Sequence, residues 1–146
     1  MLVFTVLGAV LCAALIVALV GRIGTGSGAG TGSGANGQPA TFDVGPASQR
    51  AASIARSGPL LFPDPRGGTR DIFVQHLGEA DWVAFEARAS GAPRRCALRW
   101  EQDARRFVDP CDGRIFPPDG AGLVTFPTEV NDRGRVIVDL TRPMQP

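Results

Sequence analysis

The first twenty residues, Met1–Val20, contain no charged side chain, and Thr5 is their clearest polar residue. As an α-helix they would be about 30 Å long, which matches the hydrocarbon thickness of a bilayer. We therefore predict a transmembrane helix over residues 1–21 that anchors the chain in membrane lipid. A cleaved signal peptide is the alternative, but the run has neither a basic segment before it nor a small-x-small cleavage motif.

Residues 22–47 are rich in glycine and serine and carry few apolar side chains. Such a stretch has too little apolar surface to pack, so we predict a flexible tether. Its root-mean-square reach is about 25 to 30 Å. Two interpretations have equal support: a mobile hinge, or a spacer that crosses the edge of a larger complex.

The patterns of residues 48–146 predict a single, mostly β domain. Apolar and polar residues alternate over short segments that glycine and proline turns separate, which is typical of strands. The predicted strands are 71–77, 82–89, 97–102, 106–108, 114–116, 122–126 and 135–140. We predict an all-β fold, a small sandwich or partly open barrel, preceded by the transmembrane helix.

Two shorter segments complete the predicted domain. Ser48 is a candidate N-cap for a short helix that Gly58 and Pro59 end. Residues 59–68 contain too many prolines for regular structure. The net charge of +1 provides no field that would attract nucleic acid.

Two cysteines of the domain, Cys96 and Cys111, each lie beside a turn. If bonded, they would close a loop of about 15 residues and contribute about 3 kcal/mol to stability; a free thiol pair is the alternative. A bonded pair belongs to an oxidising compartment. All fifteen basic residues are arginine, which indicates a GC-rich bacterial genome. We therefore predict a single-pass protein of the bacterial inner membrane with a periplasmic head, although Arg22 weakly favours the cytoplasmic side.

The segments around these cysteines, GAPRRCALRW and FVDPCDGRIFPPDG, resemble the two loops of the Rieske iron–sulfur family. That family has a C-x-H-x-x-C loop and a C-x-C-H-G-S-x-F loop, and one Cys and one His from each bind a two-iron cluster. Its membrane-anchored respiratory type also has an N-terminal helix, a hinge and a disulfide between the remaining cysteines. The residue match covers about residues 82–140, and the layout matches over the whole chain.

Carried over by position, the resemblance places Cys96 and Cys111 on the two disulfide cysteines. The four cluster-ligand positions become Gly91, Pro93, Asp109 and Asp112. None of them is Cys or His, and the only histidine of the chain is His76. Because a Rieske centre needs two thiolates and two imidazoles, we predict that the 2Fe–2S cluster is absent and that the chain holds no cofactor or metal.

Other site interpretations are weaker. Cys96, Cys111, Asp109 and Asp112 could bind zinc, but aspartate before proline or glycine is ordinary turn chemistry. His76 as a general base has no nucleophile to activate, so we predict no catalytic residue and no enzyme.

Four side chains are candidate partner contacts: Arg94, Arg95, Trp82 and Trp100. For the arginines the alternative is a solvated loop position, as it is for Arg105 and Arg106. For the tryptophans the alternative is a place in the core or at its edge.

The sequence thus predicts a non-redox accessory subunit that is anchored in the membrane and stabilises a larger photosynthetic or respiratory electron-transfer complex. Its predicted partners are lipid and the subunits of that complex. The alternatives are a Rieske-type electron carrier with atypical ligation and a stand-alone envelope binding module.

Overall fold

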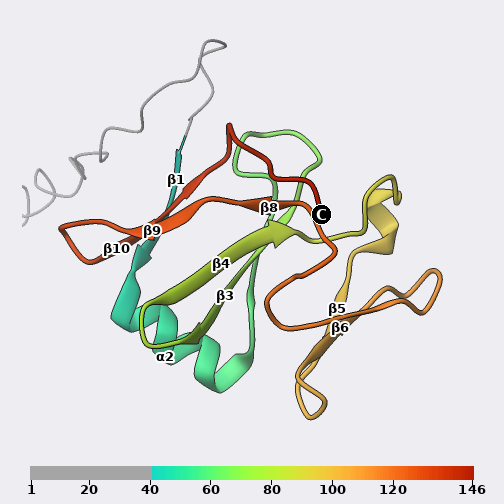
Figure 1. Cartoon of the computed structure of the whole chain (residues 1–146), viewed down its shortest axis with the longest axis horizontal. Helices are drawn as coiled ribbons and strands as arrows, with labels where there is room; N and C mark the ends of the chain where they lie inside the picture. Colours follow the sequence, from blue (N-terminus) through green and yellow to red (C-terminus); the bar gives the residue numbers. More distant parts are fainter. Residues whose placement is uncertain (1–40) are drawn as a thin grey trace, which may run out of the picture. The chain divides into compact units, whose positions relative to one another are not determined.

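The structure is a computed structural model that describes residues 41–146, which form a mostly β domain with one short α-helix (Figure 1). The predicted transmembrane helix and residues 22–40 of the predicted tether lie outside this range. Among residues 41–146, no helix has the length and apolar character needed to cross a membrane.

The elements in chain order are β1 (Thr41–Pro46), α2 (Ala47–Ser57), β2 (Leu60–Phe62), β3 (Ile72–Gly78), β4 (Asp81–Glu86), the 3₁₀ helix η1 (Arg94–Cys96), β5 (Arg99–Glu101), β6 (Arg106–Val108), β7 (Ile115–Phe116), β8 (Thr125–Phe126), β9 (Thr128–Val130) and β10 (Arg135–Asp139). All neighbouring strands are antiparallel. They form three sheets, ordered β1-β10-β9, β2-β3-β4-β8 and β5-β6-β7.

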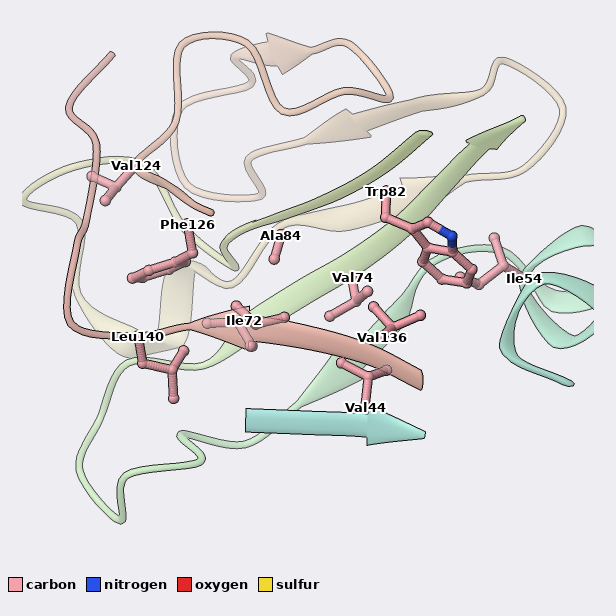
Figure 2. Packing of buried hydrophobic residues seen from close by; sticks show 11 residues of the cluster. Val44, Ile54, Ile72, Val74, Trp82, Ala84, Val124, Phe126, Val136 and Leu140 are labelled. Atoms are coloured by element: carbon pink, nitrogen blue, oxygen red, sulfur yellow. The ribbon is translucent and has the colours of Figure 1, made fainter. Parts of the chain in front are cut away.

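The β2-β3-β4-β8 sheet lies between the other two and is buried on both faces. One face of the β3–β4 hairpin packs against β1, β10 and α2, as Figure 2 shows for Val74, Val44, Val136 and Ile54. The alternating positions, including Phe73, point into a second cluster. Apolar residues on both faces of a strand are expected where layers cover both sides of a sheet.

The second cluster joins the central sheet to the β5-β6-β7 sheet. Phe107 of β6 is fully buried, and its ring centroid lies 4.9 Å from that of Phe73 and 5.2 Å from that of Phe85. Trp100 of β5 packs on the outer side of Phe107, 4.8 Å between centroids. Aromatic rings at these separations gain attraction beyond the area they bury.

Helix α2 confirms the short helix predicted before Gly58. Gly58 has a φ of 83° and donates its N–H to the carbonyl of Ile54, and this conformation ends the helix. The predicted N-cap was wrong: the helix starts at Ala47, and Pro46, not Ser48, is the capping residue. The φ of Pro46, −60°, already suits a helix start.

The structure corrects two other predictions. Residues 41–46, assigned to the tether, are strand β1, which pairs with β10. Residues 60–62, predicted to be irregular, are strand β2, which pairs with β3. The mostly β fold predicted for the domain is confirmed, and it is built from three sheets because β3 and β4 pack on both faces.

Gly120, in the turn before β8, allows the chain to pass directly over the ring of Phe85. Its φ is 73°, and its N–H binds the carbonyl of Pro117 at 3.0 Å. A Cβ at this position would overlap the Phe85 ring, which is fully buried and has no room to move. Only glycine satisfies both the conformation and the close approach.

We predict that Gly120→Ala lowers the free energy of unfolding by about 3 kcal/mol, combining left-handed strain with overpacking. Gly134→Ala is the matched control, because Gly134 has a φ of 67° and open space around its Cβ position. The control should lose only about 1 to 2 kcal/mol. Urea unfolding followed by tryptophan fluorescence measures both; equal losses would show that the Phe85 contact is unimportant.

Candidate functional site

The first cysteine loop connects β4 to β5 and ends in η1. It is held by short-range backbone bonds: Ala92 donates its N–H to the carbonyl of Ala89 at 3.0 Å, and Cys96 donates its N–H to the carbonyl of Pro93 at 2.9 Å. Leu98 then donates to the carbonyl of Ala87 at 2.7 Å, which fixes the loop exit against the end of β4. The loop is therefore a compact turn anchored on the central sheet.

Arg94 fastens this loop to the start of β3. Its Nε donates to Asp71 Oδ2 at 2.9 Å and its terminal nitrogen to Asp71 Oδ1 at 2.7 Å, a bidentate pair. Asp71 Oδ1 also accepts the backbone N–H of Asp64. The hydrogen bond from Arg94 is the main cause that lowers the pKa of Asp71 below its ordinary value. Arg94, predicted as a partner contact, thus has a bond within the domain.

The second cysteine loop connects β6 to β7 and turns on Asp109, whose carboxylate is 1% exposed. Asp109 Oδ1 accepts the N–H of Cys111 at 2.8 Å, and the Asp109 carbonyl accepts the N–H of Gly113 at 2.9 Å. Arg114 lies 3.7 Å from Asp109 Oδ2. Asp109 therefore holds the shape of the turn from inside.

Asp112 stabilises the same turn from outside. Its Oδ1 accepts the N–H of Arg114 at 3.0 Å, and its Oδ2 pairs with Arg114 Nε at 2.6 Å. The bond from the Arg114 backbone, followed by the side-chain bond, holds the pKa of Asp112 below its ordinary value. The Arg114 guanidinium also lies 5.7 Å from the centroid of the Phe116 ring.

A disulfide joins the two loops. The Cys96 and Cys111 sulfurs are 2.04 Å apart and their Cα atoms 5.6 Å apart. Cys96 is 2% exposed, so the first loop contributes a buried half of the bond, whereas Cys111 lies at the surface. The disulfide predicted from sequence is confirmed, and the free-thiol alternative does not apply to this structure.

The structure brings the predicted ligand positions together on these two loops, but their side chains do not fit a 2Fe–2S cluster. Gly91 and Pro93 lie exposed on the first loop and offer no donor atom. Asp109 and Asp112 offer only oxygens, and both sets of oxygens are engaged within the second loop. A Rieske cluster requires two thiolates and two imidazoles, and these positions supply neither.

The zinc interpretation meets a similar obstacle. One ligand atom each from Cys96, Cys111 and Asp109 lies within 4.8 Å of the others, while Asp112 is outside this group. Both sulfurs are bonded to each other, so neither is the thiolate that a metal binds.

Of the other predicted residues, Trp82, His76 and Trp100 lie away from this site, whereas Arg95 lies on the first loop. Trp82 is 8% exposed, packs on His76 with centroids 4.6 Å apart and belongs to the cluster that β3 and β4 form with α2, β1 and β10. It therefore has the core position given above as the alternative to a partner contact. His76 and the cysteine loops lie at opposite ends of the β3–β4 hairpin. Trp100 is half-buried, and Arg95 is exposed.

Sequence reasoning missed the Asp71–Arg94 clamp and the burial of the Asp109 carboxylate, although it assigned Asp109 to turn chemistry. Asp71 and Arg94 are 23 residues apart, and no local spacing rule connects them. The turn role of Asp109 has a signal in the sequence, because an aspartate side chain commonly accepts the backbone N–H of the residue two positions later and so forms an Asx-turn.

A search of solved structures finds that the chain is similar to the cyanobacterial plasma membrane Rieske protein PetC3 from Synechocystis PCC 6803. The two are 23% identical, the match covers 66% of this chain and 97% of that chain, and the TM-score is 0.49. That protein belongs to the family that the two cysteine loops resemble. No known protein-family model matches the chain, and a search of curated proteins finds no relative. At this identity and TM-score the similarity decides no function.

We predict that the double variant Cys96→Ala/Cys111→Ala loses about 3 kcal/mol of unfolding free energy, since the disulfide closes a loop of 15 residues. Denaturant unfolding with and without a reducing agent measures this. Reduction should lower the stability of the wild type by a similar amount and leave the double variant unchanged. Equal stability of wild type and double variant would contradict a structural role for the bond.

We predict that the clamp contributes stability that disappears in acid. The pKa of Asp71 is lower in the folded state than in the unfolded one, so its contribution is present above about pH 4 and is lost as the pH falls through the folded-state pKa. Asp71→Asn should therefore flatten the decline of unfolding free energy below about pH 4. Asp103→Asn, on the β5–β6 turn, is the control. The same slope in both variants would refute the prediction.

Proposed function

We propose that this chain is a membrane-anchored, non-redox accessory subunit that stabilises a larger photosynthetic or respiratory electron-transfer complex. The observation that carries the proposal is the cysteine tip, defined as residues 89–96 and 109–114. Its two loops are covalently joined by Cys96 and Cys111, while its four ligand positions lack thiolate and imidazole groups.

The residues at the former ligand positions support a structural role for the tip. Asp109 satisfies a backbone amide in the turn, and Asp112 forms an ion pair with Arg114. Arg94 adds the clamp to Asp71. A tip that is stabilised by a disulfide, an internal acceptor and a clamp presents a rigid surface, and rigid surfaces lose little entropy when they bind a partner.

The surface of the tip has the chemistry of a protein contact. Ile115, directly after the second loop, is 57% exposed, and Pro93 and Pro110 are also exposed. Arg95 is an exposed cation of the first loop without an ion pair within residues 41–146, whereas the exposed Arg94 pairs with Asp71. Exposed aliphatic side chains beside an arginine suit the core and rim of an interface. In this proposal the helix of residues 1–21 holds the chain in the inner membrane, residues 22–40 provide the connection, and the head lies in the periplasm.

Copurification of the full chain from native membranes in mild detergent tests the proposal. We expect subunits of an integral-membrane complex to accompany the chain. After separation from those subunits, which carry redox centres of their own, the chain should hold less than stoichiometric iron and give no Rieske-type electron paramagnetic resonance signal. Ile115→Glu should reduce the recovery of partners, because it places a charge in the proposed contact. Leu61→Glu is the matched control, since Leu61 is 51% exposed on β2, in a different sheet.

Three results would overturn the proposal. Stoichiometric iron with a Rieske-type spectrum would indicate an electron carrier with atypical ligation. A chain that always purifies alone, without loss of any complex when it is deleted, would indicate a stand-alone envelope binding module. Equal partner recovery with Ile115→Glu and Leu61→Glu would remove the tip from the interface.

A further inference from the structure

A cavity of about 290 Å³ lies at the opposite end of the central sheet from the cysteine tip. The end of α2, the end of β3 and the β5–β6 hairpin enclose it. Its lining includes Ile54, Gln75, Leu77, Trp100, Gln102 and Arg105. The volume is close to the lower end of the range for small-molecule sites, about 300 to 1,000 Å³.

Gln75 is the buried polar residue of this cavity and is only 3% exposed. Its Oε1 accepts the backbone N–H of His76 at 3.1 Å, and because that N–H can only donate, the orientation of the amide is determined. The NH₂ end of Gln75 has no hydrogen-bond partner within residues 41–146. This NH₂ group keeps contact with solvent at the cavity, so it can donate to a ligand there.

Gln102 presents a second donor with the same determined orientation. Its Oε1 accepts the indole N–H of Trp100 at 2.7 Å, and an indole nitrogen can only donate. The NH₂ group of Gln102 has no partner among residues 41–146. Trp100 is positioned by Gly58, since a Cβ there would lie 2.6 Å from the indole ring.

Arg105 provides the positive charge of the cavity. It occupies the turn of the β5–β6 hairpin with a φ of 47°, a conformation that favours glycine over arginine. Its guanidinium forms no ion pair or hydrogen bond within residues 41–146. The cavity lining includes no aspartate or glutamate among these residues. Arg105 is exposed and lines the cavity, so its charge is available to an anion there.

From these contacts we infer that the cavity binds a small organic carboxylate. The carboxylate oxygens accept from the Arg105 guanidinium and from the NH₂ groups of Gln75 and Gln102. The apolar part lies against Trp100, Leu77 and Ile54. The carbonyl end of α2 carries at most about half a negative charge, which the full charge of Arg105 outweighs. This site goes beyond the accessory role proposed above and is independent of it.

Titration calorimetry of the full chain in a neutral detergent, with benzoate as the probe and benzamide as its uncharged analogue, tests the inference. We expect saturable benzoate binding at one site per chain and at least tenfold weaker binding of benzamide. Arg105→Gly should keep the fold, because glycine suits the turn, and weaken benzoate binding at least tenfold. Arg133→Gly, an equal charge change in the β9–β10 turn, should leave binding unchanged.

A second variant keeps the test decisive if Arg105→Gly does not fold. Gln102→Glu retains the acceptor for Trp100 and replaces the NH₂ donor by an oxygen, so benzoate binding should fall at least tenfold. The inference is overturned if the folded wild type shows no saturable benzoate binding. It is also overturned if benzamide binds as tightly, or if Gln102→Glu binds benzoate as well as the wild type does.

Discussion

The β3–β4 hairpin is covered by apolar side chains on both faces, and the rest of the domain depends on this packing. On one side Ile72 and Val74 meet β1 and β10, and on the other Phe73 and Phe85 meet the ring of Phe107 on β6. The first cysteine loop leaves the end of β4 (Figure 1), whereas the cavity is lined by Gln75, Leu77 and Gly78 near the turn at the other end of the hairpin. One buried element therefore positions two unrelated sites.

The sheet that carries the cysteine tip has strands of only two or three residues. So few ladder bonds give little stability to loops that extend from them, and marginal sheets need additional constraints. The disulfide, the Asp71–Arg94 clamp and the buried carboxylate of Asp109 supply these constraints. Each one stabilises geometry and none supplies redox chemistry, which is consistent with a tip that acts through its surface.

Local patterns predicted much of the fold and the covalent part of the site. Alternation placed Val136 and Val138 on the buried face of the last strand, and the NDRG turn before it closes with Gly134 N–H on the Asn131 carbonyl. Strand β1 was missed because its glycine and proline are typical of loops, and its pairing comes from β10, far along the chain. Whether Trp82 lies in the core or at a partner contact stayed open in the sequence, because alternation indicates two faces of a strand without indicating that both are covered.

The sequence alone determined the donor chemistry: with one histidine and three cysteines, the chain lacks the two imidazoles of a Rieske centre, whatever its fold. It also located most strands, because periodicity is a local property. Only the tertiary structure decided which groups are engaged and which are free. Gln75 lies on β3, and Gln102 and Arg105 lie in the β5–β6 turn; their shared cavity, and the lack of an acceptor for them within residues 41–146, arise from packing between α2, β3 and the β5–β6 hairpin. Hydrogen-bond partners distant in sequence follow from that packing, which no local pattern encodes.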